Sequence, residues 1–183
     1  AQYIRQFIKT IQSIIVMKNI CFYFQIHQPH RLKRYRFFNI GSDHYYYDDF
    51  ANEDFIQRVA EVSFIPANRL MLDMIKEYGG KFKATFSISG VALDQMEIYA
   101  PEVIDGFKQL ADTGCVEFLA ETQGHSLVSL INPEEFQKQV KQHSDKLESL
   151  FGLKPKVFRN TELLYSDDIA HLVHEMGFKG ILV

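Results

Sequence analysis

The chain has 183 residues, 46% of them hydrophobic, and a formal net charge of −3 at pH 7. This size and composition are typical of a globular domain with one sizeable core, and the charge balance argues against a nucleic-acid partner. No apolar run in the sequence is long enough to cross a bilayer, so we expect no membrane partner either.

The first residues differ from the rest of the chain. Residues 1–16 resemble a leader, but Arg5 and Lys9 interrupt their apolar positions and no small-residue cleavage site follows. Met17 stands directly before the first convincing strand. We therefore predict that residues 1–16 are a non-native or upstream leader segment, that Met17 is the natural start, and that residues 17–183 form the domain.

Short apolar runs mark the strands. Residues 20–26 are continuously apolar and rich in β-branched and aromatic side chains, which predicts a buried parallel strand covered on both faces. Further strand-like runs lie at residues 82–88 and 116–120, and two more begin at residues 157 and 181. Their lengths are those of ordinary strands in globular proteins.

Helical patterns fill the spaces between these runs. Residues 30–49 lack any periodicity and are rich in polar and aromatic side chains, which predicts a long functional loop. Strand followed by helix occurs four times and a fifth strand begins, so we predict an α/β fold, an incomplete parallel (β/α) barrel with further strands beyond residue 183. The expected helix starts are Asn52 or a neighbour, Pro66, Ser89, Pro101, Asn132 and Ser166.

The two cysteines bear on the cellular location. Cys21 and Cys115 both lie inside strand-like runs. We expect them to be buried, reduced thiols of an intracellular protein, and we predict a cytoplasmic location.

Polar residues follow several of the predicted strands. In a parallel barrel the carboxyl ends of the strands meet at one rim, where ligands bind. His27 and Gln28 follow the first strand, Glu121 and His125 the third, and Glu162 the fourth. We predict that Glu162 is the catalytic carboxylate, suited to attack an anomeric carbon, and that the other four bind substrate.

The same carboxylates also have structural interpretations. Glu162 stands three residues after Arg159 and could pair with it. The spacing Glu121-x-x-x-His125 suits a metal site, but only two ligand-type residues are present and they lie on a loop. We therefore predict no metal and no cofactor.

Two other polar residues are assigned to the structure rather than to the site. Glu117 alternates with the apolar residues of its strand, and a carboxylate buried there must be paired or neutral. His143 falls on the apolar stripe of a helix, so we expect a core or boundary histidine whose hydrogen bonds are satisfied.

Three stretches together resemble glycoside hydrolase family 57, the α-amylase and 4-α-glucanotransferase family. His27-Gln28-Pro29 matches its first signature region, and residues 114–125 fit the form of its second. Residues 158–165 resemble its third region, with Glu162 in the position of the catalytic nucleophile. Order and spacing agree over nearly all of residues 17–183.

This resemblance implies a fold and an activity. Residues 17–183 would be the truncated N-terminal part of a seven-stranded (β/α)7 catalytic barrel. The implied enzyme is a retaining glycosidase of carbohydrate metabolism that acts on α-1,4-glucan oligosaccharides or polysaccharides. A retaining glycosidase needs a second carboxyl group about 5 Å from the first. The family's general acid/base Asp lies beyond residue 183, so we expect this chain alone to be almost inactive.

Departures from the family pattern leave specificity open. Cys115 stands where the second region usually has Gln, and Arg159 and Asn160 replace aromatic residues common in the third region. The sequence distinguishes neither hydrolysis from glucanotransfer nor short from long substrates, and it predicts no oligomeric state.

Two other hypotheses come from the same residues. Residues 83–86 resemble the second strand of metal-dependent polysaccharide deacetylases. Where that family has an Asp-Asp pair after the first strand and a His-x-x-x-His, this chain has His27-Gln28-Pro29 and Glu121-x-x-x-His125. From another class, the chain could be a non-catalytic carbohydrate-binding barrel that keeps the aromatic loop of residues 35–47 for stacking on sugars.

Overall fold

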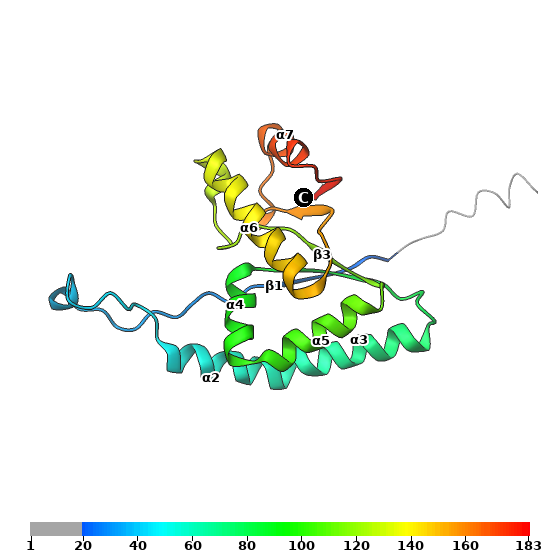
Figure 1. Cartoon of the computed structure of the whole chain (residues 1–183), viewed down its shortest axis with the longest axis horizontal. Helices are drawn as coiled ribbons and strands as arrows, with labels where there is room; N and C mark the ends of the chain where they lie inside the picture. Colours follow the sequence, from blue (N-terminus) through cyan, green and yellow to red (C-terminus); the bar gives the residue numbers. More distant parts are fainter. Residues whose placement is uncertain (1–19) are drawn as a thin grey trace, which may run out of the picture.

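The computed structural model describes residues 20–183 (Figure 1). The leader segment predicted over residues 1–16 and the start predicted at Met17 lie outside the described residues. The strands are β1 (Phe22–Ile26), β2 (Ala84–Ile88), β3 (Val116–Leu119), β4 (Val157–Arg159) and β5 (Gly180–Leu182). The α-helices are α2 (Asp49–Val59), α3 (Ile65–Glu77), α4 (Gly90–Tyr99), α5 (Pro101–Asp112), α6 (Pro133–Phe151) and α7 (Asp167–Glu175). Shorter helical segments are η1 (Phe37–Asn39), the π-helical η2 (Ala60–Phe64), η3 (Val128–Leu130) and η4 (Thr161–Leu163).

The strands run parallel and follow one another in chain order. β1 pairs with β2 and β2 pairs with β3, while β4 pairs with β5. A parallel bridge between Ala120 and Phe158 joins the two groups. Consecutive parallel strands separated by helices are the arrangement of a parallel (β/α) barrel, as the sequence predicts.

Aromatic side chains fill the space between the sheet and its covering helices. α3 and α5 lie along one side of the β1–β3 sheet, and α6 and α7 cover the part that carries β4 and β5 (Figure 1). Phe118 stacks on Phe151 with ring centroids 4.4 Å apart, and Phe107 meets Phe86 edge-on. Each buried Phe contributes about 1.5–3 kcal/mol relative to an exposed one, so this cluster fixes the helices that carry the loops at the rim.

Helix starts mostly follow the predicted signals. Asn132 caps α6 and Ser166 caps α7, each by accepting a backbone N–H of the first turn. The predicted start of α2 is Asn52 or a neighbour, and the cap is Asp48. The buried Asn52 side chain instead bonds both the N–H and the carbonyl of Arg31. Among residues 20–183, no helix combines the length and the hydropathy that a membrane span requires.

The first strand is less buried than predicted. β1 pairs only with β2 among the described strands, and the exposed fractions of Phe22 and Phe24 are 43% and 37%. The composition of a segment predicts that it forms a strand, but not which strands pair with it. Because β1 is an edge strand here, one side of it stays exposed. The predicted burial of the cysteines is wrong for the same reason at Cys21, which is exposed, while Cys115 is half-buried and both thiols are free.

Glu117 also differs from its prediction. Its side chain is exposed, whereas Val116 and Phe118 on the opposite face of β3 are buried. The alternation is therefore as predicted, but the face that carries Glu117 is open in the described part of the chain. The carboxylate needs no buried partner there.

Candidate active site

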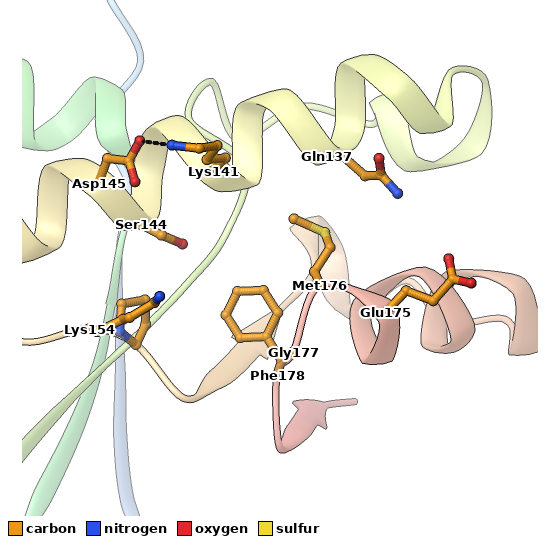
Figure 2. Close-up of a pocket in the computed structure, with 10 residues that line it drawn as sticks. Gln137, Lys141, Ser144, Asp145, Lys154, Glu175, Met176, Gly177 and Phe178 are labelled. Carbon is orange, nitrogen blue, oxygen red and sulfur yellow. Dashed lines mark hydrogen bonds and ion pairs between the residues drawn. The ribbon is translucent and has the colours of Figure 1, made fainter.

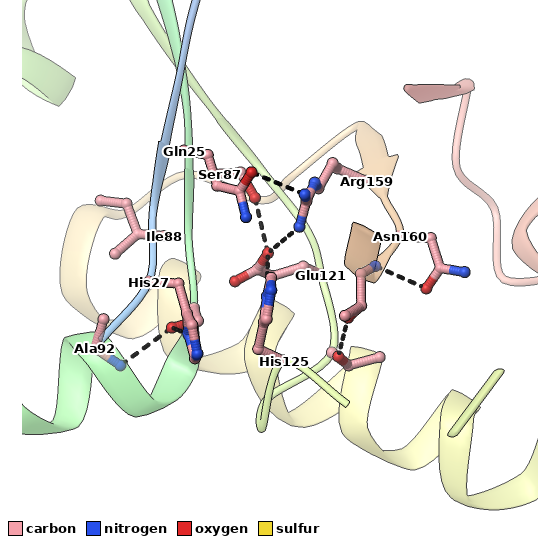
Figure 3. A network of polar contacts seen from close by, with 12 residues as sticks. Gln25, His27, Ser87, Ile88, Ala92, Glu121, His125, Arg159 and Asn160 are labelled. Atoms are coloured by element: carbon pink, nitrogen blue, oxygen red, sulfur yellow. Dashed lines mark hydrogen bonds and ion pairs between the residues drawn. The ribbon is translucent and has the colours of Figure 1, made fainter. Parts of the chain in front are cut away.

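The predicted rim residues do come together at the carboxyl ends of the strands. His27 lies just after β1, Glu121 and His125 lie in the loop after β3, and Glu162 lies in η4 directly after β4. Because the strands are parallel and in register, these loops emerge on one side of the sheet. The two histidine rings lie side by side at this rim (Figure 3).

His125 is the centre of the site. Its ring stacks on the ring of His27 with centroids 4.1 Å apart. Its Nε2 lies 3.5 Å from Oε1 of Glu162, and its Nδ1 lies 3.6 Å from Oε2 of Glu121. The ring is almost buried, so these electrostatic contacts act in a medium that screens them less than water does. One imidazole therefore faces a carboxylate at each nitrogen.

Glu121 is a buried carboxylate with a buried cation beside it. Its Oε2 accepts a hydrogen bond of 2.9 Å from Ser87 Oγ and lies 3.5 Å from Nη1 of Arg159. The same guanidinium donates a 2.8 Å hydrogen bond to Oε1 of Gln25 on β1, as Figure 3 shows. The alternative pairing of Arg159 with Glu162 is thus wrong, because Arg159 points along the sheet toward Glu121 and Gln25.

Glu162 presents its carboxylate to solvent from an unusual backbone conformation. Its side chain is 70% exposed, and its φ and ψ are 54° and 22°. Among residues 20–183 the other non-glycine residues with positive φ are His125 and Leu163. Left-handed backbone costs about 1–3 kcal/mol per residue and persists where the surroundings enforce it, commonly at functional sites. The strain falls here on the predicted catalytic carboxylate and on its histidine neighbour.

Asn160 enforces the turn that carries Glu162. Its Oδ1 accepts the backbone N–H of Thr161, and its Nδ2 donates to Ser129 Oγ and to the carbonyl of Leu164. The side chain thereby bridges the two ends of η4 and ties them to the loop after β3. Nothing in the sequence pattern predicted this role.

His27 is held by the start of the next helix. Its Nδ1 makes a 2.8 Å hydrogen bond with Ser89 Oγ, and the same hydroxyl caps α4 by accepting the N–H of Ala92. Partial burial, followed by the neighbouring ring of His125, lowers the pKa of His27, so the ring is neutral at pH 7. With Nδ1 engaged by Ser89, Nε2 is the ring nitrogen left to meet a sugar hydroxyl.

Gln28 is placed through its backbone. Its carbonyl accepts a 2.7 Å hydrogen bond from the buried Gln95 side chain of α4, which fixes the chain just after His27. The side chain of Gln28 is half-buried at the rim. The helix α4 therefore orients both residues of the first loop.

His143 is the core histidine that the sequence predicts, and it has a further contact with the site. It is fully buried on α6, where its Nε2 donates to the carbonyl of Ile88 and its Nδ1 accepts the backbone N–H of Glu121. Burial lowers the pKa of His143, so the ring stays neutral with its proton on Nε2. The apolar stripe indicated burial, but only the structure shows that the ring holds the backbone of Glu121.

One groove lies away from the rim. A groove of about 610 Å³ runs between α6 and α7, with Lys154 and Phe178 on its floor (Figure 2). These two residues precede β4 and β5, so the groove opens at the amino ends of the strands, opposite the rim. Substrates of parallel barrels bind at the carboxyl ends, and we assign this groove no part in the site.

No metal-binding cluster is formed in the described part of the chain, where no group of three or more His, Cys, Asp and Glu side chains is arranged to hold an ion. The pair Glu121 and His125 is engaged with Arg159 and Glu162 instead. The site is thus built from carboxylates, imidazoles and one guanidinium.

Comparison with known proteins matches the chain to one family over most of its length. A family model described as glycosyl hydrolase family 57 matches residues 21–183. A curated protein of Methanocaldococcus jannaschii, named "Putative alpha-amylase", is 42% identical over 165 residues, which are 88% of this chain and 35% of that protein. The chain therefore spans about a third of the length of this relative.

Solved structures share the fold at low identity. The 4-alpha-glucanotransferase from Thermococcus litoralis matches with a TM-score of 0.67 and 19% identity, over 89% of this chain and 22% of that one. The alpha-amylase AmyC from Thermotoga maritima matches with a TM-score of 0.64 and 15% identity, over 90% of this chain and 39% of that one. These similarities confirm the predicted fold, part of a parallel (β/α)7 barrel.

Proposed function

The chain belongs to glycosyl hydrolase family 57, and from this premise we propose that the protein containing it is a retaining glycosidase acting on α-1,4-glucans. The similarity to proteins named alpha-amylase and 4-alpha-glucanotransferase supports an α-glucan substrate. The observation that carries the proposal is the placement of Glu162. Its exposed carboxylate stands at the carboxyl rim, on a strained turn, beside the almost buried ring of His125.

Glu162 takes the role of nucleophile. A carboxylate oxygen attacks the anomeric carbon while the bond from that carbon to the leaving glucan oxygen breaks, which gives a covalent glycosyl-enzyme. His125 Nε2, 3.5 Å from Oε1 of Glu162, is placed to hold the carboxylate in one orientation. Water or a sugar hydroxyl then displaces Glu162 from the same face of the sugar as the original leaving group, so the α configuration is retained.

A second carboxyl group must protonate the leaving oxygen and later accept a proton from the incoming group. Glu121 does not suit that task, because it is buried, paired with Arg159 and hydrogen-bonded to Ser87. We assign the general acid/base to an Asp beyond residue 183, as the family resemblance implies. Only the complete protein would then turn over substrate.

The remaining rim residues bind the sugar. We propose that His27, Gln28 and His125 line the sugar site. Nε2 of His27 and the side-chain amide of Gln28 supply hydrogen bonds to the sugar hydroxyl groups, whereas both nitrogens of His125 face carboxylates. Glu121 is assigned to substrate binding too. Its carboxylate is fully buried, so it acts on the sugar indirectly, through its contact with His125. Free thiols at Cys21 and Cys115 suit a reducing compartment, so we propose a cytoplasmic location.

The test is Glu162→Gln in the complete protein, assayed on an α-1,4-glucan. Loss of a nucleophile lowers kcat by about 10⁴-fold or more, while the exposed side chain makes folding insensitive to the change. Glu148→Gln, at an exposed position on α6, is the matched control and should keep parental activity. A Glu162→Gln enzyme with kcat near that of the control would refute the assignment.

A further inference from the structure

Four charged or titratable side chains form a line from the sheet to the rim: Arg159, Glu121, His125 and Glu162. Arg159 lies 3.5 Å from Glu121, Glu121 lies 3.6 Å from His125, and His125 lies 3.5 Å from Glu162. The first three side chains are 1–8% exposed, whereas Glu162 is 70% exposed. Three buried side chains in mutual contact therefore end at one exposed carboxylate, that of Glu162, which substrate can reach.

The inner end of this line is rigid. Arg159 is permanently protonated, and its second contact, to Gln25, fixes the plane of the guanidinium. Glu121 is fixed twice, through its carboxylate by Ser87 and through its backbone N–H by the neutral ring of His143. β1, β2, β4 and α6 therefore all contribute to the position of one buried carboxylate.

The outer end depends on His125. Its left-handed backbone, with φ of 51°, brings the ring between two carboxylates. The ring of His27 covers one face and leaves the two nitrogens directed at Glu121 and Glu162. A carboxylate behind one nitrogen of an imidazole fixes how the other nitrogen is presented.

The unpaired atoms of this line point to function rather than to stability alone. Within residues 20–183, the buried atoms Glu121 Oε1, His125 Nδ1 and Arg159 Nε have no hydrogen-bond partner. Buried polar groups are normally satisfied, and three unsatisfied ones in a single line are costly. Catalytic contacts are often long without substrate and shorten in the complex.

We propose that the buried Glu121–Arg159 pair is the positioning device of the nucleophile: it orients the ring of His125, which in turn holds the carboxylate of Glu162. Neither Glu121 nor Arg159 touches the reacting atoms in this account. The inference rests on the proposed role of Glu162 and adds to it the part of the fold that sets its geometry.

The test separates positioning from folding. Removing one partner of a buried ion pair leaves an uncompensated charge, whereas replacing both with apolar residues of similar volume is often neutral for stability. The complete protein carrying Glu121→Leu and Arg159→Met together should therefore keep a thermal midpoint close to that of the parent. Its kcat and kcat/KM should both fall about 10–100-fold with KM nearly unchanged, because the lost interaction orients a group that acts in the transition state.

If the Glu121–Arg159 pair were purely structural, its replacement in a folded enzyme would leave kcat unchanged. A folded double variant with parental kcat would overturn the proposal. If the double variant does not fold, Glu121→Gln decides, because the amide keeps the shape and loses the charge: a folded enzyme with kcat lowered at least 10-fold supports the proposal, and parental kcat overturns it. The matched control removes the exposed pair Lys141 and Asp145 of α6, with Lys141→Gln and Asp145→Asn, and should leave kcat unchanged.

Glu162→Gln in the same assay keeps the two proposals apart. If Glu162→Gln is inactive while the double variant is fully active, only the positioning role fails. If Glu162→Gln is itself active, the proposed function fails.

Discussion

Replacing Arg159 with methionine is expected to destabilise the protein strongly. The change keeps an apolar side chain of similar length but removes the guanidinium that faces the buried carboxylate of Glu121. Breaking a buried pair by removing one partner costs about 3–5 kcal/mol. Loss of the charged hydrogen bond to Gln25 is part of that cost. We therefore expect the free energy of unfolding to fall by about 3–5 kcal/mol, measured by urea denaturation of the complete protein at pH 7.

Lys141→Met is the control for this experiment. Lys141 pairs with Asp145 on the exposed surface of α6, and exposed pairs contribute about 0–1 kcal/mol. If Arg159→Met changed the free energy of unfolding no more than Lys141→Met does, the guanidinium of Arg159 would not stabilise the buried carboxylate of Glu121, which would contradict the prediction.

Three further predictions concern the residues that hold the rim. Asn160→Ala removes the side chain that ties both ends of η4, so kcat should fall about 10–100-fold on α-glucan, and an unchanged kcat would show that the turn holds without it. Ser89→Ala removes the cap of α4 and the contact to His27; we expect about 1 kcal/mol less stability by urea denaturation and a raised KM, and a parental KM would argue against a role of His27 in binding. Burial lowers the pKa of His143, so the unfolded chain binds more protons than the folded one below about pH 6.5, and stability should fall as the pH drops through that range. His143→Gln should show a smaller loss of thermal midpoint between pH 7 and pH 5 than the parent, and equal losses would contradict the assignment.

The convergence of the rim residues could be predicted because topology alone produces it. In parallel strands connected by helices, residues that follow the strands share one edge, so His27, Glu121, His125 and Glu162 could be expected at the same rim. Spacing along the chain also gave the helix caps Asn132 and Ser166, since a cap acts within its own first turn.

The partners of those residues could not be predicted, because they come from distant parts of the chain. Arg159 is near Glu162 in sequence, which suggested the wrong pair, while its hydrogen-bond partner Gln25 is 134 positions away. His143 shows the same limit, since helical periodicity indicates the buried face but not which backbone group the ring meets. The predicted burial of β1 was wrong for a related reason: the burial of a strand depends on its neighbouring strands and not on its own composition.

Chemical rescue of Glu162→Gly by azide tests the central claim, that Glu162 is the nucleophile of a retaining enzyme. The substrate is an α-glucosyl donor with a good leaving group, and the enzyme is the complete protein. We predict that the variant is inactive alone, and that azide restores turnover by occupying the space of the missing carboxylate, which yields the β-glycosyl azide. Parental activity without azide, or formation of the α-glycosyl azide, would contradict the account.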